Sequence, residues 1–280
     1  MASFKFNFSN TEEISETKDN TDITWLSSEE IVPSNQIKDL DDLVSRARMF
    51  TCGEVEIGHV LVNNIACSNE TGLKNLIELS EKEHSDLVAG KYEGGLKIWE
   101  CTYDLIEYFE KYPDVINFKD AKVLDLGCGA GILGMYAFLK KACFVTFQDY
   151  NKEILEYCTI PNVVLNIDEE EREKEIGRCK FYSGDWTSFD KLLDESEVFD
   201  IILTSETIYN QQNYDKLISL FYNRLSDKGT VFVGAKTYYF GVGGGTRQFE
   251  AALENTNLKS EVIMKTSSGI QREIIKINKS

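Results

Sequence analysis

Apolar and polar residues follow two alternating periods along the second two-thirds of the chain. From about Ser85 on, short apolar runs typical of buried strands alternate with segments of helical period. The first such helix covers Ile98 to Phe109 and is ended by Pro113. We predict strands near 122–126, 143–148, 179–183, 199–204 and 229–236, and helices near 131–140, 151–157, 187–194, 213–225 and 246–255.

Two further strands are predicted at the end of this region, near 258–265 and 270–278. The residues Ser267-Ser268-Gly269 between them are a hairpin signal. Five strand–helix units followed by a hairpin predict an α/β protein of the Rossmann-like type. Its seven-stranded sheet would be mainly parallel, with a reversed final strand and helices on both faces.

The first part of the chain has weaker patterns. Residues 1 to about 40 are rich in Ser, Thr, Asn, Asp and Glu, and we expect them to be mostly disordered. Within them Phe4, Phe6 and Phe8 alternate, as in a small strand or an exposed docking motif. A short helix over 40–49, a strand over 55–62 and a helix over 73–79 are expected next. We therefore place an N-terminal extension over 1–84 and the main domain over 85–280.

Composition narrows the classes of function. The 280 residues contain 47 acids and 30 bases, a net charge of −17. This argues against a direct nucleic-acid partner, because phosphate backbones demand basic surface. Seven dispersed cysteines without a CxxC pair, and only two histidines, argue against a zinc cluster and favour reduced thiols. No leader-like or membrane-length apolar run appears, so no membrane partner is expected.

A glycine-spaced turn follows the strand Lys122–Leu126. It reads Gly127-x-Gly129-x-Gly131 and leads into a helix, so it lies where a nucleotide-like cofactor can approach the backbone. About twenty residues on, the next strand ends in Asp149, where ribose hydroxyls need an acceptor. A nicotinamide dehydrogenase is the competing class, although the third glycine of G-x-G-x-x-G is absent at its place.

This turn, with Asp125 before it, resembles that of class I (seven-strand) S-adenosylmethionine methyltransferases. Five further motifs occur in order, and together they closely resemble the eukaryotic histidine protein methyltransferase family over roughly residues 85–278. The first 80 or so residues match only loosely. The motifs are Lys91–Thr102, Phe147–Asn151, Ser183–Trp186, Ile202–Asn210 and Tyr239–Gly245.

The resemblance implies an enzyme that transfers a methyl group from S-adenosylmethionine to a histidine of a large-subunit ribosomal protein. It implies a basic protein partner, a location in cytoplasm and nucleus, and we expect a monomer. The acidic chain suits a basic client. A protein lysine methyltransferase and a non-catalytic ribosome-assembly protein that keeps the fold remain as alternatives.

The resemblance also implies the residues of a cofactor site. Asp149 would accept the ribose hydroxyls and Tyr150 would cover the adenine, whose amine Asp185 would bind. Glu100 would hold the amino group of the cofactor. The full set is Ile98, Trp99, Glu100, Cys101, Thr102, Asp125, Gly127, Gly129, Asp149, Tyr150, Asn151, Gly184, Asp185, Trp186 and Ser205.

On the substrate side, Glu206-x-x-Tyr209 follows the fourth strand of the predicted domain. Glu206 would accept a hydrogen bond from one imidazole nitrogen and so aim the other at the methyl group. Tyr209 would line the entrance for the substrate. The run Gly243-Gly244-Gly245 is either a mobile lid or a plain turn.

Overall fold

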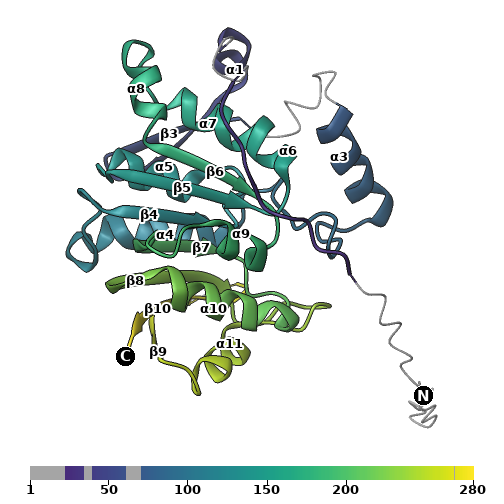
Figure 1. Ribbon diagram of the computed structural model, residues 1–280, viewed down its shortest axis with the longest axis vertical. Coiled ribbons are helices and arrows are strands. Elements are labelled where there is room, and N and C mark those ends of the chain that lie inside the picture. The colour runs from purple at the N-terminus through teal and green to yellow at the C-terminus, as the bar shows by residue number, and fades with distance from the viewer. Residues whose placement is uncertain (1–22, 35–39, 61–70, 268) are drawn as a thin grey trace, which may run out of the picture.

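The sheet of the protein has eight strands, one more than the seven predicted, because a short strand of the N-terminal extension joins its edge. A computed structural model describes residues 23–34, 40–60, 71–267 and 269–280. Its eight-stranded sheet runs in the order β1-β6-β5-β4-β7-β8-β10-β9 (Figure 1). The strands are β1 (Glu29–Glu30), β4 (Lys122–Leu126), β5 (Phe144–Asp149), β6 (Cys179–Ser183), β7 (Phe199–Ser205), β8 (Leu225–Lys236), β9 (Leu258–Lys265) and β10 (Arg272–Lys279).

Five of these strands are parallel, and the reversed strand is β10. Strands β6, β5, β4, β7 and β8 pair in parallel, whereas β10 lies between β8 and β9 and is antiparallel to both. The predicted mainly parallel sheet with a reversed final strand is therefore confirmed. Because neighbouring parallel strands end at the same edge, the turns after β4, β5, β6 and β7 meet there.

Helices cover both faces of the sheet, as the sequence predicts (Figure 1). Alternate strand residues point to opposite faces, so Val123 of β4 joins one hydrophobic core and Leu124 joins the other. Apolar side chains of α4 (Glu100–Lys111), α5 (Ile132–Leu139) and α7 (Ile160–Leu165) fill the first core. The second core contains side chains of α9 (Trp186–Leu192), α10 (Tyr214–Arg224) and α11 (Thr246–Leu253).

One predicted helix, over 151–157, has a different form. It consists of α6 (Lys152–Ile154), a π-helical turn (Leu155–Thr159) and then α7. The π turn carries Thr159, whose hydroxyl donates to the Gly129 carbonyl over 2.6 Å. The acidic run after α7 forms a 3-10 turn (Glu169–Glu171) and α8 (Arg172–Ile176). Two further 3-10 turns are Pro113–Val115 and Gln211–Asn213.

The described part of the N-terminal extension packs on the main domain. Strand β1 pairs antiparallel with β6 and Ile31 is buried, so the expectation of disorder is wrong for residues 23–34. The expected helix over 40–49 is also shorter. It is α1 (Asp41–Arg46), followed by a separate two-stranded sheet of β2 (Arg48–Cys52) and β3 (Val55–His59), and later by α3 (Thr71–Glu83).

Several sequence expectations concern parts of the chain that are not described. Phe4, Phe6 and Phe8 lie outside the described residues, as does Ser268 of the final hairpin. Six cysteines within the described ranges are free thiols. In that same part of the chain, no helix combines the length and the apolar character needed to cross a membrane.

Candidate active site

A cavity of about 840 Å³, partly open to solvent, lies where β4, β5, β6 and β7 end. That volume includes space open to solvent. Most of the residues singled out from the sequence line it, although they come from five separate segments. They are Ile98, Trp99, Thr102, Asp125, Gly127, Gly129, Asp149, Tyr150, Gly184, Asp185, Trp186, Ser205, Glu206 and Tyr209.

The glycine turn after β4 forms one wall of the cavity with bare backbone. Gly127 has a φ of 66°, and a Cβ there would lie 2.7 Å from Cγ2 of Thr207. Gly129 has a φ of 50°, and a Cβ there would lie 3.3 Å from the carbonyl oxygen of Gly95. Glycine is therefore required at Gly127 both by the backbone conformation and by the space.

Two buried acids lie behind this turn. Asp149, at the end of β5, accepts from the Gly129 amide over 2.9 Å and from the Asn151 amide over 3.1 Å. Burial raises the pKa of Asp149 to about 6. Asp125 accepts from the Gly134 amide over 2.8 Å, and burial raises its pKa to about 8, with a further contribution from the charge of Asp149.

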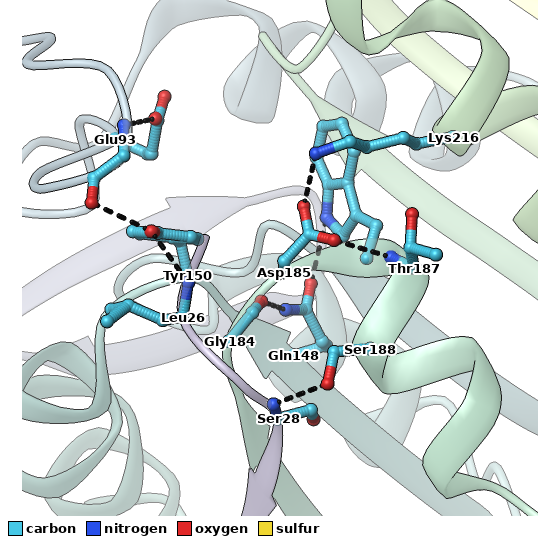
Figure 2. Close-up of polar contacts among 12 residues, drawn as sticks. Leu26, Ser28, Glu93, Gln148, Tyr150, Gly184, Asp185, Thr187, Ser188 and Lys216 are labelled. Carbon is cyan, nitrogen blue, oxygen red and sulfur yellow. Dashed lines mark hydrogen bonds and ion pairs between the residues drawn. The ribbon is translucent and has the colours of Figure 1, made fainter. Parts of the chain in front are cut away.

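The turn after β6 is held by a chain of side-chain contacts (Figure 2). Asp185 caps α9 by accepting from the Thr187 amide over 3.0 Å, and its other oxygen lies 2.7 Å from Lys216 Nζ. The indole of Trp186 donates to Gln148 over 3.0 Å. These contacts fix the orientation of Asp185 and Trp186.

The segment before α4 closes the cavity over the glycine turn, and its contribution was only partly predicted. Glu93 accepts from the Gly90 amide over 2.9 Å and from the Tyr209 hydroxyl, and burial raises its pKa. The indole of Trp99 donates to the Gly94 carbonyl over 3.1 Å. The motif around Gly94-Gly95 was recognised in the sequence, but no role was given to Glu93.

Other lining residues were not singled out from the sequence, although several lie inside the recognised motifs. The cavity is also lined by Trp25, Gly94, Gly95, Lys97, Cys128, Ala130, Ile132, Leu133, Thr207 and Asn213. For Cys128 to Leu133, the run next to the glycine turn was the available signal. Trp25 lies about a hundred residues before that turn, and nothing in its local pattern indicates the contact.

Three predicted cofactor residues lie outside the cavity wall. A helix presents only one face to a ligand, and in α4 that face contains Thr102, whose hydroxyl donates to Ser205 over 3.1 Å. The Glu100 side chain is 57% exposed, with Lys236 Nζ at 3.4 Å, and Cys101 is fully buried in the protein. Asn151 donates to the Lys91 carbonyl over 2.7 Å and so supports the loop before α4.

Glu206 follows β7 in an unusual backbone conformation. Its φ is 60°, a value that costs energy for a residue other than glycine. The side chain is buried, and neither carboxylate oxygen has a hydrogen-bond partner among the described residues. Lys236 Nζ lies 3.6 Å from Oε1, an ion-pair distance that is too long for a hydrogen bond. Burial, and then the charge of Glu206, raise the pKa of Tyr239.

Known proteins share both the sequence and the fold. Residues 78–240 match a family model described as "Lysine methyltransferase". The "Histidine protein methyltransferase 1 homolog" of Rattus norvegicus is 35% identical over 89% of this chain and 73% of its own length. The chain belongs to the histidine protein methyltransferase 1 family. Members from Bos taurus and Dictyostelium discoideum are 40% and 43% identical over 76% and 70% of this chain.

The chain spans only part of some members of the histidine protein methyltransferase 1 family, matching 64% of the bovine protein and 61% of that from Dictyostelium. Among solved structures, a putative S-adenosylmethionine-dependent methyltransferase from Streptococcus mutans matches with a TM-score of 0.52. It covers 83% of this chain and 55% of its own at 11% identity, so it shows the fold alone.

Family and fold assign S-adenosylmethionine as the cofactor, and the cavity fits it. Five carboxylates line the cavity, against one lysine, Lys97. Burial raises the pKa of Asp125 to about 8, so not all five are charged at neutral pH. The ionised carboxylates suit the positive sulfonium and ammonium of the cofactor. The bare backbone at Gly127 admits close approach, and Asp149 is an acceptor at the place where a ribose is expected. The carboxylates are those of Glu93, Asp125, Asp149, Asp185 and Glu206.

Proposed function

We propose that the protein is an S-adenosylmethionine-dependent protein-histidine N-methyltransferase. The observation that carries the proposal is the buried carboxylate of Glu206, which lines the cavity and has Lys236 Nζ at 3.6 Å from its Oε1. Burial, and then the charge of this carboxylate, raise the pKa values of the neighbouring Cys101 and Tyr239. A buried carboxylate is stabilised by each well-placed donor, and the N–H of an imidazole would be such a donor. The names of the relatives at 35–43% identity support histidine as the target.

The chain's part in the reaction would be mainly to position the imidazole. When bound, the cofactor supplies an electrophilic methyl group on its sulfonium. Glu206 accepts the N–H of one ring nitrogen, and the lone pair of the other forms the new N–C bond while the C–S bond breaks, its electron pair leaving with sulfur. A neutral imidazole, with a reference pKa of roughly 6.5, needs no strong base for this attack. The ring proton then leaves.

Positioning can account for a large part of the rate. Holding two reactants in the reactive geometry is worth about 7–11 kcal/mol in well-oriented systems. The carboxylate of Glu206 would also stabilise the positive charge that develops on the ring. Tyr209, whose hydroxyl donates to Glu93, would hold the cavity wall next to the entering side chain.

We also propose that the substrate is a basic protein, a large-subunit ribosomal protein, methylated in the cytoplasm or nucleus by a monomeric enzyme. The net charge of −17 supports a basic client, since unlike charges raise the rate of encounter. This proposal rests on the family resemblance for the identity of the client. The net charge of the chain supports only the inference that the client is basic.

Transfer of a labelled methyl group tests the activity. The purified protein is incubated with labelled S-adenosylmethionine and a large-subunit ribosomal protein fraction, and the labelled residue is identified by mass spectrometry. We expect methylhistidine, and no label with Gly127→Arg, because a side chain at that position meets Thr207. A wild-type protein that binds the cofactor but labels no histidine contradicts the proposal.

Lysine is the second candidate target. The matching family model is described as "Lysine methyltransferase", and a buried carboxylate also suits an amine. The same mass spectra decide between the two, since methyl-lysine and methylhistidine differ in residue mass. Methyl-lysine as the only product would establish the second candidate.

A further inference from the structure

Residues 23–31, which we call the N-terminal strap, cross the cavity end of β6. Within the strap, β1 pairs with β6 and the Ile31 amide donates to the Phe181 carbonyl over 2.8 Å. Lys152 adds an ion pair to Glu29 at 3.0 Å. The strap is therefore attached to the sheet by backbone pairing at one end and runs over the site from there.

The other half of the strap bonds directly to residues that line the cavity or support it (Figure 2). Leu26 donates its amide to the Tyr150 hydroxyl over 3.1 Å and accepts from the Asp185 amide over 2.9 Å. The Ser28 amide donates to the Ser188 hydroxyl over 2.8 Å. Two of the predicted adenine-site residues are thus fixed in part by a segment some 120 residues or more away in sequence.

Glycines under the strap make room for it. A Cβ at Gly184 would lie 2.6 Å from the carbonyl oxygen of Ser27, and one at Gly90 would lie 2.4 Å from a methyl of Ile23. Both glycines have positive φ, at 97° and 72°. The two loops that border the cavity therefore have the shape that the strap requires.

Trp25 is the part of the strap that lines the cavity. Its ring makes an edge contact with Tyr150, with centroids 6.1 Å apart, and Lys216 Nζ lies 3.5 Å from its centroid. Lys216 also pairs with Asp185. An indole held in place by Tyr150 and Lys216 at the wall of the cavity provides a flat apolar surface of the kind on which a purine packs.

We propose that Trp25 is a cofactor-binding residue that packs on the adenine, and that the strap is part of the cofactor site. Trp25 lies outside the residues 78–240 that match the family model. The inference rests on the proposed function, because it takes the cofactor of that function as the ligand. It extends the site to a segment that precedes the methyltransferase domain predicted from the sequence.

Calorimetric binding of S-adenosylhomocysteine tests the role of Trp25. Trp25→Ala should weaken binding about tenfold, the scale of one lost aromatic–base stack, and Trp25→Phe should retain most of the affinity. The matched control is Val32→Ala, an exposed apolar residue just after the strap. The melting temperature of each variant shows whether weaker binding reflects a lost ligand contact or a destabilised protein. Unchanged affinity in Trp25→Ala overturns the proposal.

A competitor locates the contact on the ligand. 5′-Methylthioadenosine keeps the adenine and ribose but lacks the amino-acid part. Its inhibition constant against labelled S-adenosylhomocysteine should rise in Trp25→Ala by the same factor. A loss for S-adenosylhomocysteine alone would place Trp25 at the amino-acid end and overturn the adenine assignment.

Amide hydrogen exchange measures whether ligand binding orders the N-terminal strap, and it requires no substitution in the cavity. S-adenosylhomocysteine should slow exchange at the amides of Leu26, Ser28 and Ile31, and Ser188→Ala should reduce that protection by removing one attachment of the strap. Unchanged exchange in the strap overturns its membership in the site while the proposed function stands. A wild-type protein that binds no S-adenosylhomocysteine overturns both.

Discussion

At the scale of single residues, burial raises the pKa values of two carboxyl groups in the cavity. Asp125 and Asp149 have pKa values raised to about 8 and about 6, with burial as the main cause. A raised carboxyl pKa means that the folded protein without cofactor binds more protons than the unfolded chain between about pH 4 and these values. Its stability therefore falls as pH rises through that window. A cationic cofactor offsets this cost when it binds.

The pH dependence of cofactor affinity follows from Asp149. Ribose hydroxyls need an ionised acceptor, and the ionised fraction of Asp149 falls as pH drops below about 6. We predict that the affinity for S-adenosylhomocysteine, measured by calorimetry from pH 7.5 to 5, weakens below pH 6 by up to about tenfold per unit. Asp149→Asn should bind weakly with a flatter profile. A flat profile in the wild type would show that Asp149 does not bind the ligand as an anion.

Glu206 should affect the chemical step and not cofactor binding. Glu206→Gln keeps the size of the side chain but loses the charge that orients the imidazole and stabilises it, so we predict a fall in kcat of about tenfold. Calorimetry should give unchanged affinity for S-adenosylhomocysteine. Gln212→Ala, in an exposed turn nearby, is the control. Equal losses in affinity and rate would place Glu206 on the cofactor side.

Only some residues of the candidate site could be predicted from the sequence. Gly127 and Asp149 could be selected because each stands at the carboxyl end of a strand that the apolar pattern predicts. Glu93 and Trp25 reach the cavity only through the packing of loops, which has no period in the sequence. The raised pKa values likewise depend on burial by groups far along the chain.

At the scale of elements, α5 and β5 are in unusually close contact. A Cβ at Gly134 of α5 would lie 2.2 Å from the ring of Phe147 on β5, and that ring is fully buried and stacked on Phe181 with centroids 5.2 Å apart. The short distance between helix and strand places the start of α5, and the glycine turn before it, against the sheet.

Alanine at Gly134 should therefore destabilise the protein, although alanine favours helix. We predict a loss of about 1–3 kcal/mol in the free energy of unfolding, measured by urea denaturation, because overpacking exceeds the propensity gain of about 1 kcal/mol. Gly177→Ala, at the end of α8 with negative φ and more space, is the control and should change stability little. A stabilised Gly134→Ala would show that the ring moves freely.

Helices and strands with a clear apolar pattern were predicted correctly. A polar strand that exists only through its backbone hydrogen bonds to a neighbouring strand was missed. The buried strands β4 to β7 are rich in apolar and aromatic residues, and their predicted positions agree with the structure to within a residue. Strand β1 consists of two glutamates and is formed only by pairing with β6. Its local composition indicates disorder, which is why residues 23–34 were assigned wrongly.

At the scale of the whole molecule, charge is the dominant property. A net charge of −17 creates an attractive field for a basic client. We predict that kcat/KM for an intact basic protein substrate falls several-fold between 50 and 300 mM salt, because screening shortens the Debye length from about 14 to about 6 Å. Affinity for S-adenosylhomocysteine should change much less. A salt-independent kcat/KM would argue against a basic client.

The place of β10 has a consequence for the order of assembly. It is the last strand along the chain, yet it inserts between β8 and β9, and Ile274, Ile275 and Ile277 are fully buried. Until residues 272–279 are present, β8 has an unpaired edge and both hydrophobic layers lack a wall. A ribosome that has not yet released this segment therefore carries an open sheet, and the domain can close only after residues 272–279 have been translated.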